Sequence, residues 1–357
     1  MFQDSQLKPG DVIGIIGGGQ LARMMCFEAA KLGFKTCIYS DTENSPAFQV
    51  ATSYVCASYD DTKALEGFTD RVSSVTFEFE NLPVETLNFI ASKLPLRPGA
   101  KALEISQNRL VEKKFFNDNN IATAEYLEIT SYEDLVAGFN KFQDSILKTA
   151  TLGYDGKGQF SISSGSTLEK IWHDATESNL PLILEKTVPF EREFSIVAAR
   201  SIDSKIIYYD VVENIHESGI LKKTIFPAKI DPNIKDQAEE IARITLESLE
   251  YVGVLAIEFF LVDGKLLVNE FAPRPHNSGH FSLDACLHSQ FEQGIRAAAG
   301  ISVIEPELLF SGRMVNLLGE EVNQIPELNK NSSVKTHHYG KSEIKPGRKM
   351  GHYVVRD

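Results

Sequence analysis

The chain has 357 residues, with 49 Asp and Glu against 36 Lys and Arg, a formal net charge of −13 and 43% hydrophobic residues. This length predicts two or three domains of about 100–200 residues each, and the apolar content argues against disorder. An acidic chain repels nucleic acid, so an anionic ligand must be held by locally concentrated positive groups or backbone amides. Every stretch falls short of the roughly 18 apolar residues that a membrane helix needs.

The cysteines predict a reducing compartment. They form no CxxC pair and lie in apolar stretches, which is typical of reduced core thiols. The first residues lack a basic region and a long apolar run, so we expect no signal peptide and a cytoplasmic protein. The four cysteines are Cys26, Cys37, Cys56 and Cys286.

The first hundred residues alternate strand and helix patterns. An apolar run over 12–16 breaks into three glycines, and residues 20–32 then recur at helical spacing. Further strands are predicted over 36–39 and 75–79, with a helix opening at Pro83. Residues 1–100 are therefore predicted to form an open α/β unit.

The glycine turn reads as G-x-G-x-x-A through Gly17, Gly19 and Ala22, with Asp41 about twenty residues further on. Such a turn offers backbone N–H groups to a phosphate, and the acid could accept a ribose hydroxyl. This pattern favours a dinucleotide-dependent dehydrogenase. Close packing of strand and helix explains the same glycines without any ligand.

A second glycine-rich segment, 153–158, follows a strand predicted over 145–148 that ends in Lys148. A lysine leaving a strand beneath a flexible glycine loop suits nucleotide phosphates, although the segment is not a Walker A loop. A surface hairpin with an incidental lysine is the alternative. Helices are also predicted over 109–116 and 234–249, and a further helix begins at a capping box of Ser131 and Asp134 and ends near residue 142. Strands are predicted over 182–185, 193–198 and 206–209.

Glu258 and Glu270 lie on two apolar strands, 254–261 and 266–270, around Asp263-Gly264. Half-buried carboxylates are costly unless paired or metal-bound. A two-residue turn would put them on opposite faces, so we predict an odd-length loop with a bulge that puts both on one face. Together with Asn269 they would suit Mg²⁺. Two solvent-facing acids at a strand edge are the alternative reading.

Two further segments could hold anions. Residues 272–280 read APRPHNSGH, a polar loop with two prolines. The stretch 337–352 carries four basic residues against the single acid Glu343, which indicates a phosphate grip or a solvated tail. The four basic residues are Lys341, Lys345, Arg348 and Lys349.

These motifs together resemble the ATP-grasp superfamily and, more specifically, the 5-(carboxyamino)imidazole ribonucleotide synthase family of purine biosynthesis. The resemblance spans nearly the whole chain. Its blocks are IIGGGQLARMM at 15–25, TFEFENLP at 76–83, KTATLGYDGKGQ at 148–159, NIHESGIL at 214–221, YVGVLAIEFF at 251–260, NEFAPRPHNSGH at 269–280 and KPGRKMGH at 345–352.

The resemblance implies an α/β chain of the α+β ATP-grasp class in three domains. These would be an N-terminal Rossmann-like domain over 1–100, a two-lobed ATP-grasp domain over 101–299 and a β-rich C-terminal domain over 300–357. Within the ATP-grasp domain, a lid lobe would cover about 120–185, and a lobe for metal and ATP about 186–299.

The resemblance also implies the site residues and their ligands. Glu258 and Glu270 would bind Mg²⁺. ATP would be held by Arg109, Lys148, Gly153, Tyr154, Asp155, Gly156, Lys157, Gly158, Gln159, Glu185, Lys186, Thr187, Val188, Glu193, His216, Asn269 and Glu270. Catalysis would rest on Asp155, Arg274, His276, Asn277 and Lys341. Aminoimidazole ribonucleotide would be held by Gln20, Leu21, Glu80, Tyr154, Lys157, Lys341 and Arg348.

The implied enzyme is a ligase that uses ATP and bicarbonate to carboxylate aminoimidazole ribonucleotide through carboxyphosphate, in a cytoplasmic homodimer. Lys157 stands where the family commonly has arginine, which weakens that phosphate contact. Asp41 has no counterpart role. The rival functions are a nicotinamide-dependent dehydrogenase, a nucleotide-binding regulator without turnover, and another ATP-grasp ligase that uses formate or biotin.

Overall fold

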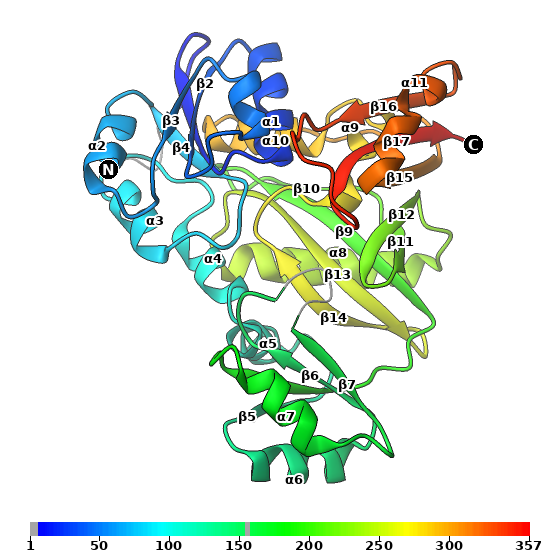
Figure 1. The fold of residues 1–357 in the computed structure, drawn as a ribbon. Coiled ribbons are helices and arrows are strands. Elements are labelled where there is room, and N and C mark those ends of the chain that lie inside the picture. Colours follow the sequence, from blue (N-terminus) through cyan, green and yellow to red (C-terminus); the bar gives the residue numbers. More distant parts are fainter. Residues whose placement is uncertain (1–5, 154–157) are drawn as a thin grey trace.

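The computed structural model of the chain describes residues 6–153 and 158–357, and these form three β-sheets (Figure 1). The first is a four-stranded parallel sheet of order β3-β2-β1-β4. Its strands are β1 (Val12–Ile16), β2 (Lys35–Ser40), β3 (Ser53–Cys56) and β4 (Ser74–Phe77), and its helices are α1 (Gln20–Lys31), α2 (Thr62–Thr69) and α3 (Val84–Ala91). The α/β unit predicted at the start of the chain is present.

Two short helices, α4 (Ala100–Ser106) and α5 (Arg109–Asp118), lead to an antiparallel sheet of order β5-β8-β6-β7. The helix α6 (Tyr132–Phe142) packs against this sheet and begins at the predicted capping box of Ser131 and Asp134. The remaining elements are β5 (Tyr126–Ile129), β6 (Ser145–Thr149), β7 (Gln159–Ile162), α7 (Leu168–Thr176) and β8 (Leu182–Lys186). In Figure 1 this unit forms the lower end of the molecule.

The third sheet has nine strands in the order β14-β13-β9-β11-β12-β15-β17-β16, with β10 paired to β9. The long helix α8 (Pro232–Ser248) packs on β9 and β14 through an apolar face that includes Ala238 and Leu246. The strands are β9 (Arg192–Arg200), β10 (Ile206–Tyr208), β11 (Val212–Glu217), β12 (Ile220–Phe226), β13 (Gly253–Val262), β14 (Lys265–Ala272), β15 (Gly312–Leu318), β16 (Val334–His338) and β17 (Lys349–Arg356).

The strands after residue 300 continue this sheet. β15 pairs antiparallel with β12, so the sheet passes without interruption into the C-terminal part of the chain. The helix α10 (Gln290–Ala298) packs against α1, and its Phe291 and Ile295 share a core with Met24 and Met25 of that helix. These contacts join the three parts of the chain around one central region.

The hairpin of β13 and β14 corrects one prediction. Val262 pairs with Lys265, so the turn has two residues, Asp263 and Gly264, and the predicted odd-length loop is wrong. The predicted bulge does occur. It lies inside the ladder, where Phe259 pairs with Val268 but Glu258 pairs with Glu270, and Asn269 is the extra residue. The bulge therefore places both glutamates directly opposite each other, as predicted.

Three of the cysteines, Cys26, Cys37 and Cys286, are buried, as predicted. Cys56 is exposed because it ends the edge strand β3, whose residues alternate between half-buried and exposed positions, so its placement in the core was wrong. Over the described ranges, the structure contains no helix long and apolar enough to cross a membrane.

Candidate active site

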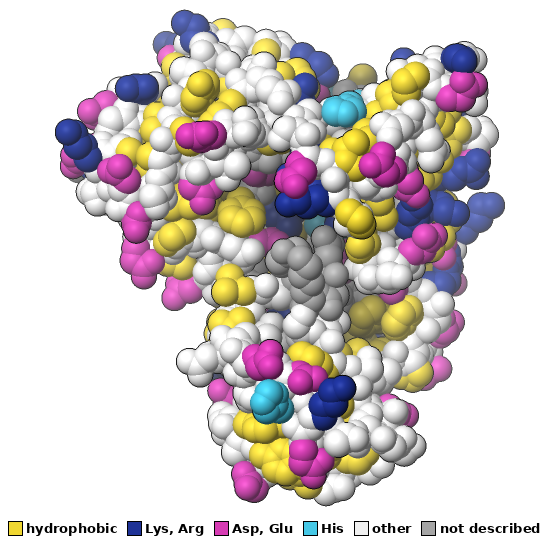
Figure 2. Space-filling view, in the orientation of Figure 1, with side chains coloured by type: hydrophobic (Ala, Val, Ile, Leu, Met, Phe, Trp, Pro, Cys, Tyr) yellow, Lys and Arg dark blue, Asp and Glu magenta, His cyan; other side chains and the backbone are white. Residues whose placement is uncertain are grey.

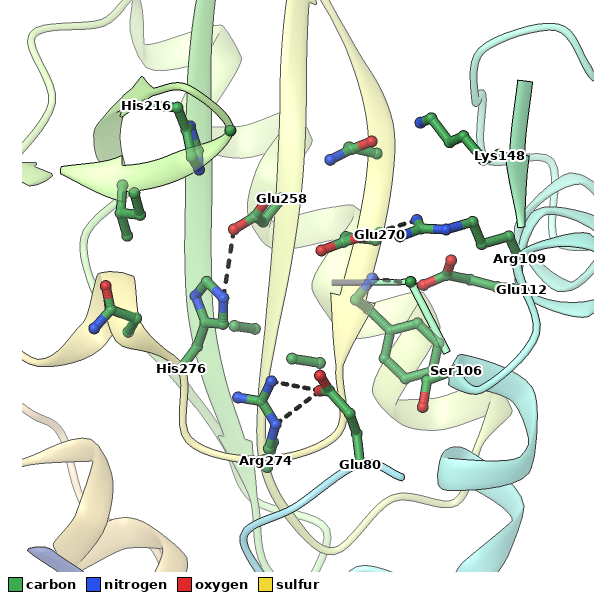
Figure 3. Close-up of a pocket in the computed structure, with 18 of the residues that line it drawn as sticks. Glu80, Ser106, Arg109, Glu112, Lys148, His216, Glu258, Glu270, Arg274 and His276 are labelled. Atoms are coloured by element: carbon green, nitrogen blue, oxygen red, sulfur yellow. Dashed lines mark hydrogen bonds and ion pairs between the residues drawn. The ribbon is translucent and has the colours of Figure 1, made fainter. Parts of the chain in front are cut away.

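A cavity of about 500 Å³ lies where the three sheets meet, and most of the residues singled out by their motifs line it (Figure 3). On the face shown in Figure 2, acidic and basic side chains are interspersed over the described surface. The predicted residues that line the cavity are Gln20, Leu21, Glu80, Arg109, Lys148, Gly153, Gln159, Glu193, His216, Glu258, Asn269, Glu270, Arg274, His276 and Asn277.

Two facing carboxylates occupy the centre of the cavity. Glu258 of β13 and Glu270 of β14 are register partners, and Asn269 beside them also lines the cavity. Burial and the neighbouring Glu270 raise the pKa of Glu258 to about 7. Burial acts the same way on Glu270, but Arg109, whose Nη1 lies 2.9 Å from its Oε2, outweighs it and lowers the pKa. The pair thus holds like charges at close range with one cationic side chain in place.

Buried lysines stand beside these carboxylates. Lys148, at the end of β6, donates from Nζ to Oε2 of Glu185 at 2.8 Å, and Lys113 of α5 lies 3.4 Å from Oε1 of the same group. Burial raises the pKa of Glu185, but the two ammonium groups outweigh burial and lower this pKa to about 2. Two lysines thus share one carboxylate, which leaves an excess of positive charge beside the cavity. Glu185 itself is buried behind Lys148 and is not part of the cavity lining.

Glu112 is a cavity residue that sequence reasoning missed. It lies one helical turn after Arg109 on α5, is almost fully buried, and its Oε1 accepts the backbone N–H of Phe271 at 2.7 Å. Burial and the nearby Glu270 raise its pKa to about 8. The signal was available, because an acid on the same helical face as the buried Phe116 needs a partner.

A second missed feature is a pair of stacked rings. Phe190 and Phe260 both line the cavity, and their ring centroids lie 4.7 Å apart with the planes 14° from parallel. Glu193 and His216 lie in the same lining, with Nδ1 of His216 2.5 Å from Oε2 of Glu193. Burial lowers the pKa of His216, but Glu193 and Glu258 together outweigh it and the net shift is upward. A flat apolar surface beside a carboxylate can take an aromatic base and a hydroxyl-bearing sugar.

The loop after β14 supplies the opposite wall. Arg274 donates from Nε to Oε2 of Glu80 at 2.8 Å, and Nε2 of His276 lies 3.4 Å from Oε1 of Glu258 (Figure 3). Burial and the neighbouring Arg274 hold the pKa of His276 well below its usual range. Asn277 lies beyond it and pairs with Asn316 of β15. These donors converge on the space in front of the carboxylate pair.

The N-terminal glycine turn is occupied by the protein itself. The carboxylate of Glu78 accepts the backbone N–H of Gly19 at 2.8 Å, and a Cβ on Gly17 or Gly19 would lie within 3.0 Å of that side chain. An internal acid therefore takes the position at the start of α1 where a dinucleotide would place its phosphate. Asp41 is exposed and bonded to Thr42. These contacts count against the dehydrogenase reading.

Several predicted residues lie away from the cavity lining. Lys186 is exposed and pairs with Glu125, and the N–H of Thr187 donates to Asp144. Lys341 donates to the carbonyl of Lys349, and Arg348 to that of Glu343. Gly158 and Val188 also lie outside the lining, whereas Lys349 lies within it. The predicted site residues Tyr154, Asp155, Gly156 and Lys157 lie outside the described residues.

Three family models match successive parts of the chain. The ribonucleotide synthetase preATP-grasp domain matches residues 11–107, and the ATP-grasp domain matches residues 114–291. The phosphoribosylaminoimidazole carboxylase C-terminal domain matches residues 313–357.

Relatives match over nearly the whole chain. An N5-carboxyaminoimidazole ribonucleotide synthase of Brucella melitensis is 42% identical over 98% of this chain and 97% of its own length. A crystal structure of such a synthetase with ADP has a TM-score of 0.95 and 40% identity, covering 99% of this chain and 94% of that one. The Aspergillus clavatus enzyme with ADP and 5-aminoimidazole ribonucleotide has a TM-score of 0.90 and 26% identity, covering 98% and 94%.

Proposed function

The chain belongs to the N5-carboxyaminoimidazole ribonucleotide synthase family of ATP-grasp enzymes, and on this premise we propose how its cavity divides the reaction. It is an ATP-dependent ligase of de novo purine biosynthesis that carboxylates 5-aminoimidazole ribonucleotide with bicarbonate. The observation that supports the division is the facing pair Glu258 and Glu270, which separates a wall bearing Arg109 and Lys148 from a wall bearing Arg274 and His276.

The first wall takes ATP. Phe190 and Phe260 offer the apolar surface for adenine, and Glu193 accepts hydrogen bonds from the ribose hydroxyls. Lys148 and Arg109 then lie on the side of the phosphates, where their buried charges act in a low dielectric and neutralise charge that develops during phosphoryl transfer. In this arrangement the residues 185–188 belong to the nucleotide site, with Glu185 acting through Lys148.

The carboxylate pair suits Mg²⁺. All the donors are oxygens. Burial and the repulsion by Glu270 raise the pKa of Glu258, and a bound cation would relieve both effects. Glu258 and Glu270 would hold the ion, with Asn269 beside them. When bound, Mg²⁺ supplies charge neutralisation for the phosphates of ATP.

The second wall takes bicarbonate and the ribonucleotide. A bicarbonate oxygen attacks the γ-phosphorus, the bond to ADP breaks, and carboxyphosphate forms. Arg274, His276 and Asn277 hold this anion, whose carbon then reaches the exocyclic amine as phosphate leaves. Asp155 accepts the amine proton, and Lys341 holds the new carboxylate, as family resemblance implies. Gln20, Leu21 and Glu80 face the ribonucleotide from the N-terminal unit.

An assay of ADP release tests this function. We expect rapid release only with ATP, bicarbonate and 5-aminoimidazole ribonucleotide together, with one carbamate formed per ADP. Omission of bicarbonate or the ribonucleotide should return release to background. Binding of ATP without ADP release in the complete mixture would instead identify a nucleotide-binding regulator.

From membership of this family we also infer the domain bounds, the cellular compartment and the oligomeric state. We infer domains over 1–100, 101–299 and 300–357. Support comes from the three family models, which match residues 11–107, 114–291 and 313–357. We also infer a cytoplasmic homodimer. Light scattering on the purified chain measures the oligomer, and a mass of one chain at micromolar concentration would contradict the dimer.

A further inference from the structure

His276 ends a chain of buried side chains that reaches it across three strands. Thr224 of β12 donates from Oγ1 to Oδ1 of Asn214 at 3.1 Å, and Asn214 of β11 donates from Nδ2 to Oγ of Ser195 at 2.9 Å. Ser195 of β9 donates to Oγ of Ser278 at 2.8 Å, and that hydroxyl lies 2.9 Å from Nδ1 of His276. Ser195, Thr224 and Ser278 are inaccessible to solvent, and Asn214 is 5% exposed.

The direction of this chain is fixed at two independent points. At one end, the amide nitrogen of Asn214 can only donate, so the hydroxyl oxygen of Ser195 accepts this hydrogen bond. The hydroxyl of Ser195 then donates its own hydrogen bond to Ser278. Ser278 then has its hydroxyl proton available for Nδ1 of His276. At the other end, the backbone N–H of Ser278 lies 3.3 Å from the same Nδ1 and can only donate. The backbone N–H thus requires a lone pair on Nδ1, and the hydroxyl proton of Ser278 finds its acceptor at the same atom.

We propose that Ser278, Ser195, Asn214 and Thr224 are positioning residues that hold His276 as the tautomer with its proton on Nε2. This nitrogen is the one that faces the cavity, 3.4 Å from Oε1 of Glu258 (Figure 3). His276 therefore presents an N–H donor to the reacting anions and has no lone pair there for a general base.

The catalytic consequence rests on the proposed function, whereas the tautomer does not. A donor at this position stabilises the negative charge of bicarbonate and carboxyphosphate, as a fixed N–H does at an oxyanion. The two claims separate in experiment, because the proton position is measured on the protein alone.

The test is nitrogen-detected NMR of the imidazole rings in chain labelled with ¹⁵N-histidine, with the His276 signals assigned from their loss in His276→Gln. We expect Nδ1 unprotonated in the natural chain at neutral pH. Asn214→Asp replaces the donating NH₂ by an accepting oxygen of the same shape, so Ser195 and Ser278 must turn their protons toward residue 214. The backbone N–H of Ser278 still favours a lone pair on Nδ1 in this variant. We therefore expect a mixture in which part of the His276 population carries its proton on Nδ1, and kcat to fall about tenfold with unchanged ADP affinity.

Asn88→Asp makes the same chemical change at an exposed position of α3 and should leave both the spectrum and kcat unchanged. If Asn214→Asp fails to fold, Ser278→Ala replaces it, since it keeps the backbone donor; we then expect the Nε2 proton to persist and kcat to fall about tenfold. A protonated Nδ1 in the natural chain, or a tautomer ratio in folded Asn214→Asp that equals the ratio in the natural chain, overturns the proposal. Absence of ADP release with the expected tautomer in place overturns only the function.

Discussion

Among single residues, Glu270 has the most demanding position, because it faces a second carboxylate while it accepts a hydrogen bond from Arg109. We expect Glu270→Gln to lower ADP release by at least about 100-fold, since the amide cannot hold the cation or the arginine equally well. ADP release in the complete mixture measures the effect, and circular dichroism should show an unchanged fold. Glu128→Gln, at an exposed position of β5, is the matched control. Near-normal release from Glu270→Gln would remove the metal assignment.

The pH dependence of stability is set in part by Glu185. Its pKa in the folded chain is about 2, against 4.5 for the free group, so its contribution is fully present above pH 4.5 and is lost as the pH falls toward 2. The full contribution corresponds to about 3 kcal/mol. We expect Glu185→Gln to be less stable than the natural chain at pH 7, with a smaller difference at pH 3, in urea unfolding. An equal difference at both values would mean that the lysines do not hold this carboxylate ionised.

Residue types revealed part of the site in advance. Lys148, Glu258, Glu270 and the loop from Arg274 to Asn277 could be found because charged groups interrupt apolar strands. Phe190 and Phe260 gave no such signal, because a phenylalanine in an apolar stretch reads as core. Whether two rings stack into a cavity depends on how separate elements meet.

At the scale of elements, the prediction for the β13–β14 hairpin was right about the facing glutamates but wrong about the length of the turn. A two-residue turn alone would leave the glutamates on opposite faces, and the bulge at Asn269 reverses this within the ladder. Bulges have weak sequence signals, whereas Asp-Gly marks a two-residue turn well. The helices α1, α6 and α8 were predictable because their apolar residues recur at a clear helical spacing, which is also a strong local signal.

Two helical glycines give opposite predictions for one substitution. A Cβ on Gly138 of α6 would lie 2.6 Å from Cδ2 of Leu184, whereas a Cβ on Gly67 of α2 meets nothing within 4 Å. We expect Gly138→Ala to destabilise the chain by about 1–3 kcal/mol through overpacking. Gly67→Ala should stabilise it by about 0.5–1 kcal/mol by restricting the unfolded chain. Thermal unfolding of the two variants compares them directly, and shifts of the same sign would contradict the packing argument.

At the scale of the whole molecule, the pairing of β12 with β15 could not be read from the sequence. These strands lie far apart in the chain, and β11 and β12 carry charged residues that hide their apolar alternation. Local periodicity predicts an element, but the order of strands depends on contacts between distant segments. The continuous sheet is therefore a finding of the structure.

The C-terminal part of the chain also reaches the cavity, through Lys349, whose carbonyl accepts from Lys341. We expect Lys341→Ala to lower the ADP release that depends on 5-aminoimidazole ribonucleotide by about tenfold, with little change in ATP affinity. Steady-state kinetics with the ribonucleotide as the varied substrate measures this. Lys330→Ala, at an exposed position before β16, serves as the control. Unchanged kinetics for Lys341→Ala would identify the basic stretch as a solvated surface.

The nine-stranded sheet restricts which parts of the molecule can shift against one another during turnover. Glu258, Glu270 and the C-terminal strands belong to one hydrogen-bonded sheet, and separating any two of its neighbouring strands would break several backbone hydrogen bonds at once. Over residues 6–153 and 158–357, the sheet that carries Lys148 shares no strand pairing with the nine-stranded sheet. The backbone pairings of the nine-stranded sheet therefore fix the spacing of Glu258, Glu270 and Asn316, whereas no strand pairing among the described residues fixes the distance from Lys148 to Glu270. We therefore expect the proposed metal site and the C-terminal strands to stay rigid relative to each other during turnover, and any shift within the site to occur between Lys148 and this sheet.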